Sequence, residues 1–125
     1  MKLLIVEDSE PDRFYFSMIA SRSGRSVEIL EAQNGKEGLE QISDTVDIIF
    51  LDINMPIMNG LEFVAAYSER LKNSSEPKEI PVYITSSSQN KAEIEQITSY
   101  SFVKEFIEKP IDKDYLTKLL EKYAQ

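Results

Sequence analysis

The stretch IIFLDINMPIMNG, residues 48–60, joins four consecutive apolar residues to a carboxylate at Asp52. An uninterrupted apolar run of this length is typical of a strand that is covered on both faces, as in a parallel sheet with helices on each side. Asp52 follows the run directly, so it is expected where the strand leaves the sheet. The stretch therefore predicts an α/β fold with an acid at the end of a buried strand.

The rest of the chain alternates apolar, β-branched segments with segments of helical period. Three helix starts are marked by residues that cap helix N-termini, namely Ser9, Asn34 and Asp112. Regular alternation of strand and helix predicts a parallel sheet with crossover helices. The predicted strands are 2–6, 27–30, 47–51, 81–85 and 103–108.

The polarity of the predicted strands indicates their order. The first and third are uninterrupted apolar runs, as central strands are, whereas the second carries Glu28 and the fifth carries Lys104 and Glu105, as edge strands can. This gradient fits a flavodoxin-like, doubly wound sheet of five parallel strands in the order 2-1-3-4-5, with helices on both faces. A chain of 125 residues is the length of one ordinary domain, so we expect a single domain over residues 1–125.

Composition excludes several classes of function. Cysteine and histidine are both absent, which removes disulfides, thiolate chemistry and the usual zinc ligands. A net charge of -8 disfavours nucleic-acid binding. No segment approaches the roughly 18 apolar residues of a membrane helix, and the N-terminus is not a signal peptide. We therefore expect a soluble, cytoplasmic protein that binds neither nucleic acid nor membrane.

Polar side chains gather at the predicted carboxyl ends of the strands, where parallel α/β sheets form their functional crevice. Like charges crowded at one site raise one another's pKa unless a cation is present, so three carboxylates predict a hard divalent metal on oxygen ligands, with Mg²⁺ favoured. For any single acid, a polar loop is the simpler interpretation. The gathered residues are Glu7, Asp8, Asp52, Thr85 and Lys109.

These residues give the chain a resemblance to a known family, the receiver domain of two-component response regulators, in particular its single-domain, chemotaxis-regulator-like members. The motifs occur in order along nearly the whole sequence. They are the acidic pair Glu7-Asp8, LDINMP with Asp52, Gly60, Thr85 followed by the small Ser86, and Lys109-Pro110. The first acid is a glutamate where aspartate is common in the family.

The resemblance implies a role for each matched residue. Asp52 is the phosphoacceptor, and Mg²⁺ or Mn²⁺ is held by Asp8, by Glu7 through water, by Asp52 and by the backbone carbonyl of Asn54. Lys109 neutralises charge on the phosphoryl oxygens during the transfer.

The resemblance also implies a conformational switch. Thr85 and Ser86 adjoin the phosphoryl group, and Thr85 turns toward it while Phe106 rotates inward. From the residues alone, Phe106 would be interpreted as core and Thr85 as a strand-end hydroxyl bonded to backbone.

The partners implied are a sensor histidine kinase or a histidine phosphotransfer protein as the phosphoryl donor. We expect no effector domain, and therefore expect output by protein–protein interaction or by phosphoryl relay. The expected output face is formed by the fourth helix, the strand 103–108 and the last helix, and it includes Tyr115. A phosphorylation-dependent homodimer is a further expectation. The protein is expected to catalyse only its own phosphorylation and dephosphorylation.

Other functions of the same fold fit less well. A flavodoxin-like carrier needs a phosphate-binding loop after its first strand, where Glu7-Asp8 would repel the flavin phosphate. A phosphohydrolase of the haloacid dehalogenase type needs a carboxylic acid two residues after its nucleophile, where this chain has Asn54. A pseudo-receiver that acts only as an interaction module is disfavoured because the phosphorylation residues are all present.

Some apolar and aromatic residues carry no functional prediction. We expect Met55, Ile57 and Met58, in the turn after Asp52, to be core, with an exposed contact for a partner as the alternative. Tyr67 and Tyr83 are expected to be surface or half-buried residues.

Overall fold

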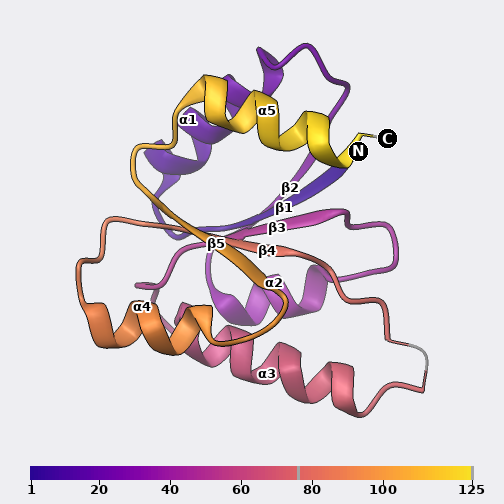
Figure 1. Ribbon diagram of the computed structural model, residues 1–125, viewed down its shortest axis with the longest axis vertical. Helices are drawn as coiled ribbons and strands as arrows, with labels where there is room; N and C mark the ends of the chain where they lie inside the picture. The colour runs from indigo at the N-terminus through magenta and orange to yellow at the C-terminus, as the bar shows by residue number, and fades with distance from the viewer. Residues whose placement is uncertain (76, 125) are drawn as a thin grey trace.

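The computed structural model describes residues 1–75 and 77–124, and in this part of the chain five strands alternate with five helices (Figure 1). Glu76 and Gln125, which the single-domain prediction includes, lie outside the described residues. The elements are β1 (Lys2–Val6), α1 (Glu10–Ser21), β2 (Glu28–Ala32), α2 (Gly35–Gln41), β3 (Ile48–Leu51), α3 (Gly60–Lys72), β4 (Val82–Ser86), α4 (Lys91–Thr98), β5 (Val103–Glu108) and α5 (Lys113–Tyr123).

The strands form one parallel sheet in the order β2-β1-β3-β4-β5, which confirms the predicted order. Val6, the last residue of β1, is in register with Leu51, the last residue of β3. The backbone N–H of Asp52 donates to the Val6 carbonyl oxygen at 3.0 Å. Because the two central strands end at the same level, the residues that follow them emerge side by side.

Helices cover both faces of the sheet. Helices α1 and α5 lie on one face, and α2, α3 and α4 lie on the other (Figure 1). Each face has its own apolar core, one around Phe16, Phe50 and Leu116 and the other around Leu51, Phe63 and Ile84. The uninterrupted apolar run of β3 supplies residues to both cores, as expected for a strand covered on both sides. Within the described residues, every helix is too short or too polar to span a membrane.

Two tyrosines are buried, so the prediction that they are surface or half-buried residues is wrong. Tyr67 is 1% exposed and Tyr83 is 2% exposed. The Tyr67 hydroxyl accepts a hydrogen bond from the Ile80 N–H at 2.8 Å, and the Tyr83 and Tyr123 hydroxyls lie 2.6 Å apart. Each phenol thus keeps a polar partner while its ring packs in the core, which removes the cost of burying the hydroxyl.

The apolar residues in the turn after Asp52, which were expected to be core, differ in how deeply they are buried. Met55 is buried and Met58 is half-buried, but Ile57 is 77% exposed, so the prediction for Ile57 is wrong. Its φ is 68°, in the left-handed region that β-branched residues rarely adopt. The path of the turn, rather than burial of its side chain, determines the position of Ile57.

Candidate functional site

The end of β1 holds Glu7 in a fixed position. The Glu7 N–H donates to the Ala32 carbonyl oxygen at 2.9 Å, and Arg13 Nη1 donates to the Glu7 carbonyl oxygen at 2.8 Å. The side chain is also bound, because Glu7 Oε2 accepts from the Ser9 N–H at 3.2 Å. The carboxylate is therefore buried with its backbone held on both sides, whereas Asp8, the next residue, is exposed.

Helix α1 begins directly after these acids. The Ser9 hydroxyl accepts from the Asp12 N–H at 3.3 Å, which confirms Ser9 as the predicted N-cap. Pro11 follows the cap near the start of the helix, where its missing N–H costs nothing. Because α1 begins only four residues after the end of β1, Asp12 in its first turn lies close to the residues that follow β1.

The end of β3 holds Asp52 equally firmly. Asp52 is 6% exposed, and its Oδ1 accepts from the Ile53 N–H at 2.8 Å. Gly60 N–H donates to the Ile53 carbonyl oxygen at 2.7 Å, and a Cβ at Gly60 would lie 2.6 Å from the Asp52 carbonyl oxygen. Only glycine permits this approach of backbone to backbone, which gives Gly60 a physical reason for its place in the motif.

Glu7, Asp8 and Asp52 are brought together as the sequence predicts. Each offers a carboxylate oxygen, and these atoms all lie within 4.8 Å of one another. The donor set consists of hard oxygen atoms, two residues of it are buried, and neither nitrogen nor sulfur takes part, so it fits Mg²⁺ or Mn²⁺. Both Glu7 oxygens already have protein partners, Ser9 and Lys109, which is consistent with an indirect contact to a metal. Asn54 is exposed in the loop that follows.

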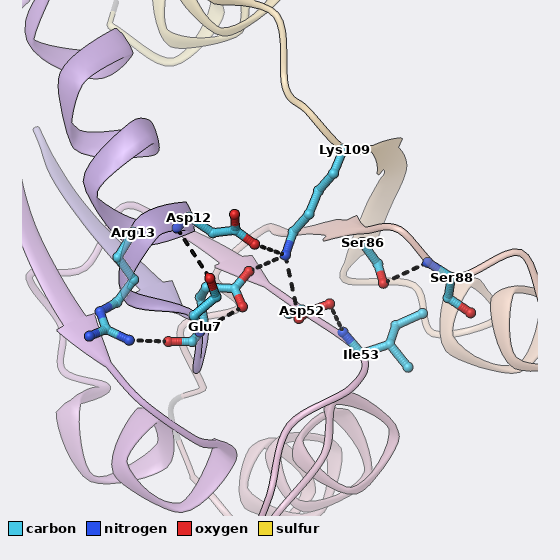
Figure 2. Close-up of polar contacts among 9 residues, drawn as sticks. Glu7, Asp12, Arg13, Asp52, Ile53, Ser86, Ser88 and Lys109 are labelled. Carbon is cyan, nitrogen blue, oxygen red and sulfur yellow. Dashed lines mark hydrogen bonds and ion pairs between the residues drawn. The ribbon is translucent and has the colours of Figure 1, made fainter.

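Lys109 extends from the loop after β5 into this acidic cluster, as Figure 2 shows. Its Nζ donates to Glu7 Oε1 in a very short contact, to Asp12 Oδ2 at 2.8 Å and to Asp52 Oδ2 at 3.5 Å. The sequence predicts that Lys109 and Asp52 gather at the same crevice, but not that Lys109 contacts Asp12 more closely than Asp52. The signal for Asp12 was its place in the first turn of a helix that begins beside the crevice.

The pKa values of the cluster reflect burial and charge. Burial raises the pKa of the Glu7 carboxyl, the hydrogen bond from Lys109 opposes this rise and the charge of Asp52 adds to it, so that the pKa is about 7. Burial lowers the pKa of Lys109, but hydrogen bonds to Asp12 and Glu7 and the charge of Asp52 outweigh it, so the pKa lies above its ordinary value. Lys109 is therefore a permanent cation within the acidic cluster.

The end of β4 borders the same site. Ser86 is fully buried, and its hydroxyl accepts from the Ser88 N–H at 3.2 Å. Thr85 is half-buried and lines a cavity of about 380 Å³ together with Lys109, Glu7 and Asp12. Among the described residues, the Thr85 hydroxyl has no hydrogen-bond partner. The bond from this hydroxyl to backbone, which was the alternative to a switch role, is therefore absent, and the side chain lines the cavity.

Phe106 does not lie among these polar groups. It is half-buried and packs against the core on the α3 and α4 side of the sheet. Phe106 is in register with Ile84, which directly precedes Thr85 in β4. Thr85 at the crevice and the β4 residue that pairs with Phe106 are therefore neighbours in the chain, so a movement of Thr85 can affect how Phe106 packs.

Comparisons with known proteins agree with this geometry. The family model for the response regulator receiver domain matches residues 3–121. The chain is 36% identical over 124 residues to the chemotaxis protein CheY1 of Helicobacter pylori, covering 97% of this chain and 94% of that protein. It is 32% identical over 126 residues to the chemotaxis protein CheY of Listeria monocytogenes, covering 100% and 99%.

Solved structures show the same fold. The chemotaxis protein CheY4 of Vibrio cholerae superposes with a TM-score of 0.74 at 26% identity, covering 98% of each chain. The N-terminal domain of a protein from Wolinella succinogenes gives a TM-score of 0.80 at 28% identity, covering 98% of this chain and 93% of that one.

Proposed function

Because the chain belongs to the response regulator receiver domain family, whose members are phosphorylation-switched signalling proteins, we propose that Asp52 is the residue that accepts the phosphoryl group. The observation that carries this proposal is the position of the Asp52 carboxylate. It is buried at the end of a central strand, 3.5 Å from the Lys109 ammonium and next to two further acids. Residues 1–125 act as one receiver domain in this proposal.

The covalent step is an attack by Asp52 on phosphorus. One carboxylate oxygen forms the new P–O bond, while the bond from phosphorus to the donor breaks and its electron pair leaves with the donor. Oδ1 is held by the Ile53 N–H, which leaves Oδ2, the oxygen on the Lys109 side, to react. Lys109 then neutralises charge on the phosphoryl oxygens, and the small, buried Ser86 leaves space beside them.

Magnesium fits the acids beside Asp52 and would be held by Asp8 and Asp52, by Glu7 through water and by the Asn54 backbone carbonyl. When bound, the ion neutralises charge on the transferring phosphoryl group. Without it, Lys109 is the single cation that contacts the side-chain carboxylates of Glu7 and Asp52 among the described residues.

Phosphorylation would be reported through Thr85 and Phe106. The unpartnered hydroxyl of Thr85, in the cavity beside Lys109, can turn toward a phosphoryl oxygen. Phe106, in register with the neighbouring residue of β4, can then repack on the α4 side of the sheet. The output surface in this proposal is formed by α4, β5 and α5, with Lys104 and Tyr115 at its surface.

The phosphoryl donor proposed is a histidine kinase or a histidine phosphotransfer protein, in which the P–N bond to a histidine breaks. Output then occurs by binding of a protein partner, or of a second copy of the chain, to the α4-β5-α5 surface. The chain catalyses no reaction on another substrate in this proposal, apart from its own phosphorylation and dephosphorylation.

Intact mass spectrometry tests the covalent step. Incubation with acetyl phosphate and Mg²⁺ should add the mass of one phosphoryl group to the wild-type chain. Asp52→Asn should abolish this gain, whereas Asp44→Asn, which removes an exposed acid from the α2–β3 loop, should leave it unchanged. Equal labelling of Asp52→Asn and wild type would refute the assignment of Asp52.

A further inference from the structure

Asp12 holds the cation on which the proposed reaction depends. Figure 2 shows the Lys109 ammonium between the carboxylates of Glu7, Asp12 and Asp52. The distance from Nζ is 2.8 Å to Asp12 Oδ2 and 3.5 Å to Asp52 Oδ2. The lysine therefore makes its weakest contact with the residue that is to be phosphorylated.

The placement of Asp12 is a consequence of where α1 begins. Its backbone N–H is satisfied by the Ser9 cap, and its side chain turns away from the helix toward Lys109. In the described part of the chain, the Asp12 carboxylate has no other hydrogen-bond or ion-pair partner. It is also not a member of the Glu7, Asp8 and Asp52 group, whose oxygens are close enough to share a metal ion.

Together, these observations separate Asp12 from the metal-binding acids. We propose that Asp12 is a positioning residue that draws Lys109 away from Asp52 and thereby slows phosphorylation and weakens binding of the phosphoryl group. This inference rests on the proposed function of Asp52. It assigns Asp12 a role through Lys109, not through the metal or the reacting atoms.

The direction of the effect follows from the contacts that remain without Asp12. Glu7 still binds Lys109, so the ammonium stays inside the crevice, next to Asp52. To contact a phosphoryl oxygen on Asp52, the ammonium must move toward Asp52, and it no longer has to loosen an ion pair with Asp12 to do so. The charge that would repel an incoming anionic donor is also removed.

Labelling rates measure the effect. With acetyl phosphate and Mg²⁺, Asp12→Asn should gain the phosphoryl mass about two- to fivefold faster than wild type, the range expected from one partly exposed ion pair. It should also be half-saturated by beryllofluoride at a proportionally lower concentration. Asp12→Glu keeps a carboxylate that can bind Lys109 and should return both values toward wild type.

Glu10→Gln is the matched control for charge alone. Glu10 is exposed in the same turn of α1, and among the described residues its side chain makes no hydrogen bond or ion pair. The substitution removes the same net charge without releasing Lys109, so its labelling rate should stay near that of wild type. An equal acceleration by Glu10→Gln would show that general repulsion, not Lys109, is responsible, and would overturn the inference.

The outcomes separate the two proposals. If wild type, Glu10→Gln and Asp12→Asn all fail to gain mass, the proposed function fails, and the inference fails with it. If wild type is labelled but Asp12→Asn is labelled at the same rate or more slowly, only the role of Asp12 is refuted. A faster Asp12→Asn with an unchanged Glu10→Gln supports both.

Discussion

The acids that follow β1 and β3 differ in their surroundings from Thr85 in β4 and Phe106 in β5. After β1 and β3, the side chains of Glu7 and Asp52 are buried and bound, both to backbone N–H groups and to Lys109. At β4 and β5, Thr85 and Phe106 are half-buried, and the Thr85 hydroxyl has no partner among the described residues.

This difference implies that the two groups of residues contribute differently to the free energy of unfolding and to the response to phosphorylation. A bound carboxylate contributes to the folded state whether or not a ligand is present, and its removal changes the free energy of unfolding. A half-buried side chain with unoccupied space beside it contributes little to that free energy but can change position at little cost. We therefore expect substitutions that affect the acids after β1 and β3 to change stability, and substitutions in β4 and β5 to change the response to phosphorylation.

The largest expected effect on stability is that of Lys109→Ala. Without metal, the variant leaves Glu7 and Asp52 together with no cation, and removing one partner of a buried ion pair typically costs about 3 kcal/mol or more. The Lys109 side chain is 20% exposed, so we expect a loss of about 3 kcal/mol in the free energy of unfolding at pH 8. Urea unfolding in the presence of a chelator measures this loss.

Lys113→Ala is the control for that measurement. Lys113 is exposed at the start of α5, and among the described residues its ammonium contacts no carboxylate. Its loss should change the free energy of unfolding by less than about 0.5 kcal/mol. Equal losses from the two variants would mean that the acids after β1 and β3 are solvated, and their contrast with the residues of β4 and β5 would not hold.

The pH dependence of stability gives the next largest effect. The Glu7 pKa is raised from its ordinary value of 4.5 to about 7 by burial. The folded chain therefore binds a proton that the unfolded chain has already lost between these pH values, and the stabilisation from protonated Glu7 is lost as pH rises through 7. From pH 5 to pH 8 this loss is on the order of 2 to 3 kcal/mol in the metal-free protein.

Glu7→Gln isolates this contribution from those of the other acids. The free energy of unfolding of wild type, minus that of Glu7→Gln, should fall between pH 5 and pH 8, because glutamine does not titrate. Urea unfolding at each pH, again with a chelator, gives the difference. Parallel pH profiles for the two chains would contradict the raised pKa.

The sequence predicts the parts of this structure that depend on local pattern. The apolar run before Asp52 identifies a strand covered on both faces, and the residues Ser9, Asn34 and Asp112 each cap the helix they were expected to begin. The gathering of Glu7, Asp8 and Asp52 also follows, because parallel strands end at one edge of a sheet.

Contacts between distant segments were not predictable in the same way. Asp12 and Lys109 are separated by 97 positions, and their contact depends on the angle at which α1 leaves β1. The hydroxyl of the buried Tyr67 accepts from the Ile80 N–H in the α3–β4 loop, a partner that no periodicity indicates. The exposure of Ile57 likewise depends on the path of one turn.

The smallest expected change in stability is that of Thr85→Ala, and it is the substitution that most sharply tests the role of β4 and β5. The free energy of unfolding should change by less than about 0.5 kcal/mol, because a half-buried hydroxyl without a partner is removed. Phosphorylation should persist, since Asp52 and Lys109 are intact. Beryllofluoride should nevertheless produce much weaker changes in amide hydrogen exchange over residues 86–108 than in wild type, because the link from the phosphoryl site to β5 is lost. Thr45→Ala, in the loop before the opposite end of β3, should respond as wild type does. A full exchange response in Thr85→Ala would mean that Thr85 is only a strand-end residue and that the signal leaves the crevice by another path.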